Sequence, residues 1–226
     1  MLYAAGFIAL FLILWAVFMF LGPLIQRVLA MLGNVTASFR YRDYVPVVVL
    51  LAAGLAGTAF AADQFIELAE LVRAESPLLQ QIDTSIHEWA RGQRSAGATL
   101  FFTAFTHLGS PVGLAIIVVG VTAVLLRSGR YRWAVYLLAT TVIGGLLVLQ
   151  LKLFFSRTRP DLAVALRSAQ GFSFPSGHAM GTTVVFGALC YLILRAHKPW
   201  RLRAAGLAFA TTIVLAVSLS RVYLGV

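Results

Sequence analysis

Charged residues are scarce in this sequence. Only 12% of its 226 residues are Asp, Glu, Lys or Arg, against roughly 25% in an ordinary soluble domain. Since 60% of the residues are hydrophobic and the mean hydropathy is +0.89, lipid must be the main solvent of the chain. A membrane-spanning helix needs roughly 20 apolar residues, so the length allows about six to seven spans.

Cysteine and acidic residues are also few. A single cysteine, Cys190, excludes an internal disulfide, and no cluster of Cys and His suggests a zinc site. The 18 basic residues outnumber the 8 acidic ones, which gives a net charge of +10. In a soluble protein this excess would suggest nucleic acid, but membrane proteins concentrate basic residues in cytoplasmic loops. We therefore expect membrane lipids as partners and no nucleic acid.

Long apolar runs dominate the chain. They show no strict alternation, and backbone polar groups in lipid must be satisfied within their own segment, so each run predicts a helix. The sequence thus predicts an all-α, multi-pass transmembrane bundle with about six spans, at residues 2–32, 44–62, 99–126, 133–155, 178–195 and 204–219.

The charges are divided between alternate loops. Ten of the eighteen basic residues fall in loops 27–43, 127–132 and 195–203, whereas seven of the eight acidic residues fall in the others. The positive-inside rule then places those three loops in the cytoplasm and the N-terminus outside. In the outer connection 63–98, apolar residues recur at helical spacing from Leu78 to Trp89, which predicts either a short amphipathic helix on the membrane or an ordinary surface helix.

Eight basic residues remain on the predicted outer side, and five of them lie in unusual places, against the general bias. A charged side chain near the end of a span either has a function or extends its charged group toward the lipid headgroups. The five residues are Lys152, Arg157, Arg159, Arg167 and Arg221.

Three short motifs contain most of these residues. Lys152 is followed by six residues and then Arg159-Pro160; Pro175-Ser176-Gly177-His178 opens the fifth run; Ser220-Arg221 ends the sixth. The pattern resembles the signature of the type 2 phosphatidic acid phosphatase (PAP2) family: Lys, six residues, Arg-Pro; then Pro-Ser-Gly-His; then Ser-Arg, five residues, His, three residues, Asp. The resemblance covers residues 44–226 as a phosphatase domain and leaves residues 1–43 as an additional N-terminal helix and cytoplasmic loop.

The residue types suit a phosphate ester. Guanidinium groups bind phosphate oxygens in a fork, a lysine adds a point charge, and a helix N-terminus attracts anions. Gly177 permits close approach, and the histidine can donate a proton near neutral pH. The resemblance implies that a phosphohistidine forms, that His178 protonates the leaving group, and that phosphoryl oxygens are held without metal or cofactor by Lys152, Arg159, Ser176, Gly177 and Arg221. Arg157 is a further candidate for this cluster, and His107 is a weaker one.

The nucleophilic histidine of the third motif would directly follow Val226, and the family's aspartate and last span would come after it. We therefore expect this polypeptide to be truncated and not to release phosphate from a lipid above a Lys152→Ala control. The resemblance implies a lipid phosphatase of the cell (inner) membrane whose site faces the periplasm or outside.

The sequence leaves several questions open. Phosphatidic acid, phosphatidylglycerol phosphate and undecaprenyl diphosphate are unranked as substrates, and the oligomeric state is unknown. A lipid-to-lipid phosphotransferase or a non-catalytic pseudo-phosphatase would have the same motifs. A transporter is disfavoured, because it would spread charges through several helices instead of clustering them on one face.

Overall fold

The computed structural model describes residues 2–35, 45–74, 76–157, 171–196 and 199–225. Every regular element in these ranges is a helix, which confirms the all-α prediction. The helices are α1 (Leu2–Val35), α2 (Val45–Arg73), α3 (Pro77–Gly92), α4 (Ala96–Leu108), α5 (Pro111–Arg127), α6 (Tyr131–Phe155), α7 (Gly177–Arg195) and α8 (Trp200–Leu224).

Four of the six predicted spans are single helices in the described part of the chain. Among the described residues, four helices are long and apolar enough to cross a membrane, at Ala4–Val28, Tyr131–Phe155, Gly177–Arg195 and Trp200–Leu224. A fifth span is possible if the bent pair α4 and α5 counts as one. The run predicted at 44–62 falls on the first part of α2, where many of the side chains lie outside the described residues.

The run predicted as a single helix at 99–126 is broken. Its two halves, α4 and α5, meet at an angle of 53°. Pro111 has no N–H to donate, and Ser110 caps α5 by accepting a hydrogen bond from Gly113 N at 3.0 Å. A proline at the first position and a serine cap both favour a new helix start, which explains the break that hydropathy alone did not reveal.

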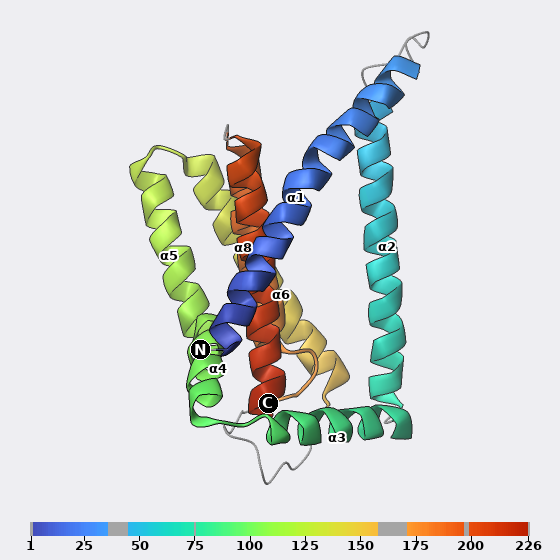
Figure 1. Ribbon diagram of the computed structural model, residues 1–226, viewed down its shortest axis with the longest axis vertical. Coiled ribbons are helices and arrows are strands. Elements are labelled where there is room, and N and C mark those ends of the chain that lie inside the picture. Colours follow the sequence, from blue (N-terminus) through green and yellow to red (C-terminus); the bar gives the residue numbers. More distant parts are fainter. Residues whose placement is uncertain (1, 36–44, 75, 158–170, 197–198, 226) are drawn as a thin grey trace.

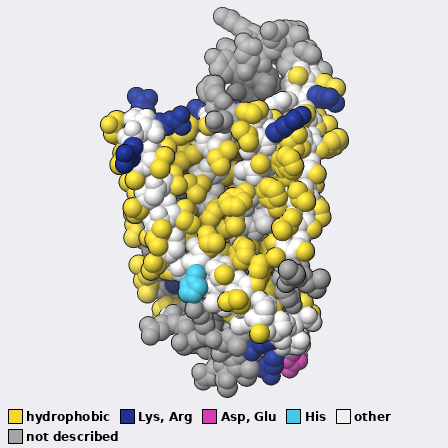
Figure 2. All heavy atoms as spheres, turned by 60° about the vertical axis from the view of Figure 1, so that its left-hand side comes forward, with side chains coloured by type: hydrophobic (Ala, Val, Ile, Leu, Met, Phe, Trp, Pro, Cys, Tyr) yellow, Lys and Arg dark blue, Asp and Glu magenta, His cyan; other side chains and the backbone are white. Residues whose placement is uncertain are grey.

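The long helices run up and down between two ends of the molecule (Figure 1). Helix α3 lies across one end, roughly perpendicular to them, and the C-terminus of α8 lies at the same end. We call this the α3 end and the other the opposite end. Figure 2 shows one face of the molecule, on which apolar side chains cover the middle and Lys and Arg side chains gather mainly toward the ends.

The core is formed chiefly by α5, α6, α7 and α8. Small residues let the helices approach closely: Ala204, Ala208 and Ala216 on α8 are fully buried. A Cβ on Gly144 of α6 would lie 2.6 Å from Val184 Cγ1 of α7, so only glycine fits there. This close packing holds together the helix ends that carry the predicted phosphate ligands.

Candidate functional site

The described site residues come from three helix ends, all at the α3 end (Figure 1). Lys152 lies in the last turn of α6, Ser176 to His178 begin α7, and Arg221 lies in the last turn of α8. Because α7 packs on both α6 and α8, these ends are neighbours. Arg159 and Arg167, also named from the sequence, lie outside the described residues.

Lys152 lies against the start of α7. Its side chain is half-buried, and Nζ donates a 2.6 Å hydrogen bond to the carbonyl oxygen of Phe172. A Cβ built on Gly177 would be 3.4 Å from Lys152 Cε, an ordinary van der Waals contact. The structure therefore brings Lys152 and Gly177 together. Protein packing does not itself require glycine at 177, so close approach of a ligand remains the predicted reason for it.

The first turn of α7 is capped by Ser176. Its Oγ accepts a hydrogen bond from Ala179 N at 3.4 Å, and its carbonyl oxygen accepts one from Met180 N. The Oγ acts as an acceptor in this cap, so the hydroxyl hydrogen can still be donated to an anion. The N–H groups of the first turn lie outside the intrahelical hydrogen-bond ladder, and such helix starts bind phosphate and carboxylate groups.

The segment before α7, residues 171–176, is attached at several points. Besides the bond from Lys152, Ser173 donates from its backbone N (2.9 Å) and from Oγ (3.1 Å) to the carbonyl oxygen of Arg157. The ring of Phe174 stacks on Phe65 of α2, with centroids 5.8 Å apart, and meets Phe155 of α6 edge-on at 5.1 Å. These attachments to two helices and to Arg157 fix where α7 begins.

Arg221 has a partner that the sequence did not reveal. Its Nη1 donates a 3.0 Å hydrogen bond to Oγ1 of Thr106, a side chain on α4 that is only 1% exposed. A buried hydroxyl in this position orients the guanidinium of a half-buried arginine. The only hint in the sequence was that Thr106 neighbours His107 in the third apolar run; His107 itself is exposed.

The α4–α5 break lies beside the turn of α7 that carries His178. Thr182 Oγ1 donates to the carbonyl oxygen of His178 at 2.7 Å, and a Cβ on Gly109 would be 2.8 Å from that same Oγ1. His178 is half-buried at the first turn of α7. The break therefore helps to define the protein surface around the predicted proton donor.

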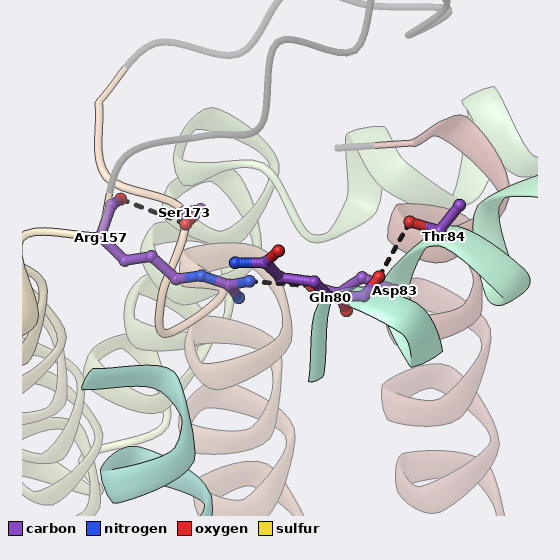
Figure 3. A network of polar contacts seen from close by, with 5 residues as sticks. All are labelled: Gln80, Asp83, Thr84, Arg157 and Ser173. Atoms are coloured by element: carbon purple, nitrogen blue, oxygen red, sulfur yellow. Dashed lines mark hydrogen bonds and ion pairs between the residues drawn. The ribbon is translucent and has the colours of Figure 1, made fainter. Parts of the chain in front are cut away.

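Arg157, the further candidate for the phosphate cluster, forms an ion pair with another helix. Its Nη2 forms a 2.8 Å ion pair with Asp83 of α3 (Figure 3). The pair connects α3 to the segment that precedes α7.

Taken together, the fold and this cluster define an all-helical membrane protein with a cluster of cationic side chains and a helix N-terminus at one end of its bundle. Residues 133–226, which include all the described site residues, match the family model described as the PAP2 superfamily. This match agrees with the family resemblance that the motifs predicted.

Two comparisons with individual proteins agree with the family. The chain is 29% identical over 164 residues to phosphatidylglycerophosphatase B of Bacillus subtilis (strain 168), covering 72% of this chain and 79% of the relative. Its structure is similar to the crystal structure of a transmembrane PAP2 type phosphatidylglycerolphosphate phosphatase from Bacillus subtilis, with a TM-score of 0.63 and 28% identity. That similarity covers 72% of this chain and 82% of the solved one.

Proposed function

We propose that this protein is a membrane phosphatase that removes phosphate from a lipid phosphate ester. One observation carries the proposal: Lys152 lies against Gly177 at the N-terminus of α7, in the part of the chain that matches the PAP2 superfamily model. A cation and a helix start at the same place suit a group with nearly two negative charges. Arg221 at the neighbouring end of α8, and Arg159, would supply further charge.

The proposed reaction proceeds through a phosphohistidine. A histidine nitrogen attacks phosphorus and the bond from phosphorus to the leaving oxygen breaks, while His178 gives its proton to that oxygen. Water then attacks the phosphohistidine and releases phosphate. Lys152, Arg159, Arg221 and the start of α7 stabilise the charge on the phosphoryl oxygens. In the family's third motif the attacking histidine comes directly after position 226, so it is outside the residues described here.

Phosphatidylglycerol phosphate is the first substrate to test. The similar Bacillus subtilis relative and the similar solved structure both have this activity in their names. Phosphatidic acid and undecaprenyl diphosphate present the same charged group on a lipid and remain the other candidates. The proposed cations Lys152, Arg159 and Arg221 bind the phosphate group that all three lipids share. Other contacts must therefore discriminate among these lipids.

The test measures binding before turnover. Purified protein in phosphatidylcholine nanodiscs is titrated with dioctanoyl phosphatidic acid or dioctanoyl phosphatidylglycerol phosphate, and occupancy is read by native mass spectrometry. We expect both to bind at least tenfold more tightly than dioctanoyl phosphatidylglycerol, which lacks the phosphate monoester. Equal affinities for the three lipids would overturn the proposal. Phosphate release, assayed with a chain extended through the third motif, then separates a phosphatase from a pseudo-phosphatase.

We also propose that the α3 end faces the periplasm or outside. Support comes from the basic residues at the opposite end, including Arg127, Arg130 and Arg132. The native thiol of Cys190 is buried, so an introduced surface cysteine can be labelled selectively. In intact cells a membrane-impermeant maleimide should label Glu88→Cys and not Ser128→Cys; the reverse pattern would show the opposite orientation.

A further inference from the structure

Helix α3 has two distinct faces. One face turns toward the bundle: Ala90 is 1% exposed, and Asp83 and His87 are half-buried. An apolar stripe lies on another side of the helix and stays exposed, formed by Leu78, Ile82, Ile86 and Trp89. At about 100° per residue the centres of the two faces are separated by roughly a third of a turn. A helix with an exposed apolar stripe, lying across the end of a transmembrane bundle, suits the membrane interface.

The bundle face of α3 is connected to the site by one ion pair. Asp83 accepts a 2.8 Å hydrogen bond from Arg157 Nη2, and the two side chains are 34% and 26% exposed. Figure 3 shows the arginine side chain extending to α3 from the chain just after α6. This pair is less exposed than an ordinary surface ion pair, so solvent screens it less.

The backbone of Arg157 holds the segment before α7. Its carbonyl oxygen accepts both hydrogen bonds of Ser173, from the backbone N at 2.9 Å and from Oγ at 3.1 Å (Figure 3). Ser173 is only three residues before the cap Ser176. One residue therefore contacts α3 with its side chain and the site segment with its backbone.

We propose that Asp83 and Arg157 are positioning residues that couple the interfacial helix α3 to the anion-binding start of α7. The ion pair fixes the backbone of Arg157, Arg157 fixes Ser173, and Ser173 sets the position of Ser176 and Gly177. The inference rests on the proposed function only in its effect on lipid phosphate binding. Its structural part, the attachment of segment 171–174 to α3, is independent of what the site binds.

A substitution of Asp83 distinguishes two roles of Arg157: positioning the segment before α7, or binding the phosphate directly. In Asp83→Asn the side chain keeps its size and loses its charge, so the attachment weakens while Arg157 keeps its own positive charge. If Arg157 contacted the phosphate, releasing it from Asp83 would strengthen binding. If Arg157 positions the segment, the same substitution weakens binding.

The experiment measures both parts on the same nanodisc samples. Hydrogen-exchange mass spectrometry follows the peptide that covers residues 171–174, and native mass spectrometry gives the Kd for dioctanoyl phosphatidic acid. Asp83→Asn and Arg157→Gln remove the pair, Asp83→Glu retains it, and the double variant Asp83→Arg with Arg157→Asp exchanges its charges. Glu88→Gln is the matched control, because it removes one exposed carboxylate from the same helix.

We expect exchange in 171–174 to become about threefold to fivefold faster, and the Kd to rise by a similar factor, in Asp83→Asn and Arg157→Gln. Asp83→Glu and Glu88→Gln should stay within twofold of wild type, and the charge exchange should recover at least half of both effects. Unchanged exchange in both single variants, or tighter binding in Asp83→Asn, would overturn the positioning role. The two parts can also fail separately. If hydrogen exchange in 171–174 is faster in the variants but the wild type does not prefer phosphatidic acid to phosphatidylglycerol, the attachment is supported and the proposed function is rejected.

Discussion

The basic residues predicted to set orientation and those predicted to bind phosphate lie at opposite ends of the bundle, in different environments. At the opposite end, six arginines are solvent-exposed: Arg27, Arg127, Arg130, Arg132, Arg195 and Arg201. At the α3 end, Lys152, Arg157 and Arg221 are half-buried, and each donates to a defined oxygen: a carbonyl, a carboxylate and a hydroxyl. Exposed arginines need no fixed geometry to set orientation in a membrane, whereas ligand-binding cations must be held in place.

The three half-buried basic residues at the α3 end also differ in their hydrogen-bond acceptors. Lys152 and Arg221 belong to the predicted motifs, and each donates one hydrogen bond to a neutral oxygen, that of the Phe172 carbonyl and that of the Thr106 hydroxyl. Arg157 is paired with a carboxylate, which neutralises it. These hydrogen bonds differ in acceptor between the predicted phosphate ligands and the proposed positioning residue, a difference that counting basic residues does not reveal.

The largest effect should come from removing a cation of the site. Lys152→Ala and Arg221→Ala should each raise the Kd for dioctanoyl phosphatidic acid by about 10- to 100-fold, the value of a charge-assisted hydrogen bond. Native mass spectrometry in nanodiscs measures the Kd. Arg132→Ala at the opposite end is the control and should stay within twofold. Equal losses in all three variants would mean that net charge, and not the site, governs binding.

A smaller effect should follow from releasing Arg221 from its partner. Thr106→Val keeps the shape of the side chain but removes the acceptor, and we expect a roughly fivefold rise in the same Kd, because a hydrogen bond to a charged group is worth about 1.5 kcal/mol or less at this exposure. Thr106→Ser should restore most of the affinity.

The matched control for Thr106 is Thr122. Its side chain is also buried in the adjacent helix α5, and its Oγ1 has no hydrogen-bond partner in the described part of the chain. Thr122→Val should therefore leave the Kd unchanged and should not lower thermal stability. A rise in the Kd as large as that of Thr106→Val would assign both effects to core packing.

A third effect concerns the cap of α7. Ser176→Ala removes an N-cap and a hydroxyl donor, so we expect a stability loss of about 1 kcal/mol and a threefold to fivefold weaker binding of dioctanoyl phosphatidic acid. Ser95 caps α4 in the same manner, accepting from Ala98 N at 3.2 Å. Ser95→Ala should cost similar stability in a thermal unfolding assay and leave the Kd within twofold. Unchanged binding in Ser176→Ala would show that its hydroxyl is only a structural cap.

The sequence predicted the parts of this molecule that depend on local patterns. Apolar runs located the helices, and motif spacing supplied the predicted site residues Lys152, Ser176, His178 and Arg221, since each signal lies within one short segment. It missed the contacts that arise only from packing. Arg221 and Thr106 are 115 residues apart, and Arg157 and Asp83 are 74 apart. Hydropathy also averaged over the α4–α5 break, because Gly109 and Ser110 interrupt an otherwise apolar run.

The smallest effect should come from the opposite end itself. Replacing Arg127, Arg130 and Arg132 together with Gln removes three positive charges, yet the Kd for dioctanoyl phosphatidic acid should change by less than twofold. Lys152 lies 20 residues after Arg132 along α6, a rise of about 30 Å and several times the screening length of about 8 Å at physiological salt. A fivefold loss at 0.15 M salt that vanished at 1 M salt would show instead that the field of the whole chain attracts the ligand. The two ends would then act together, and burial with a fixed partner would no longer distinguish the cations that bind from those that orient.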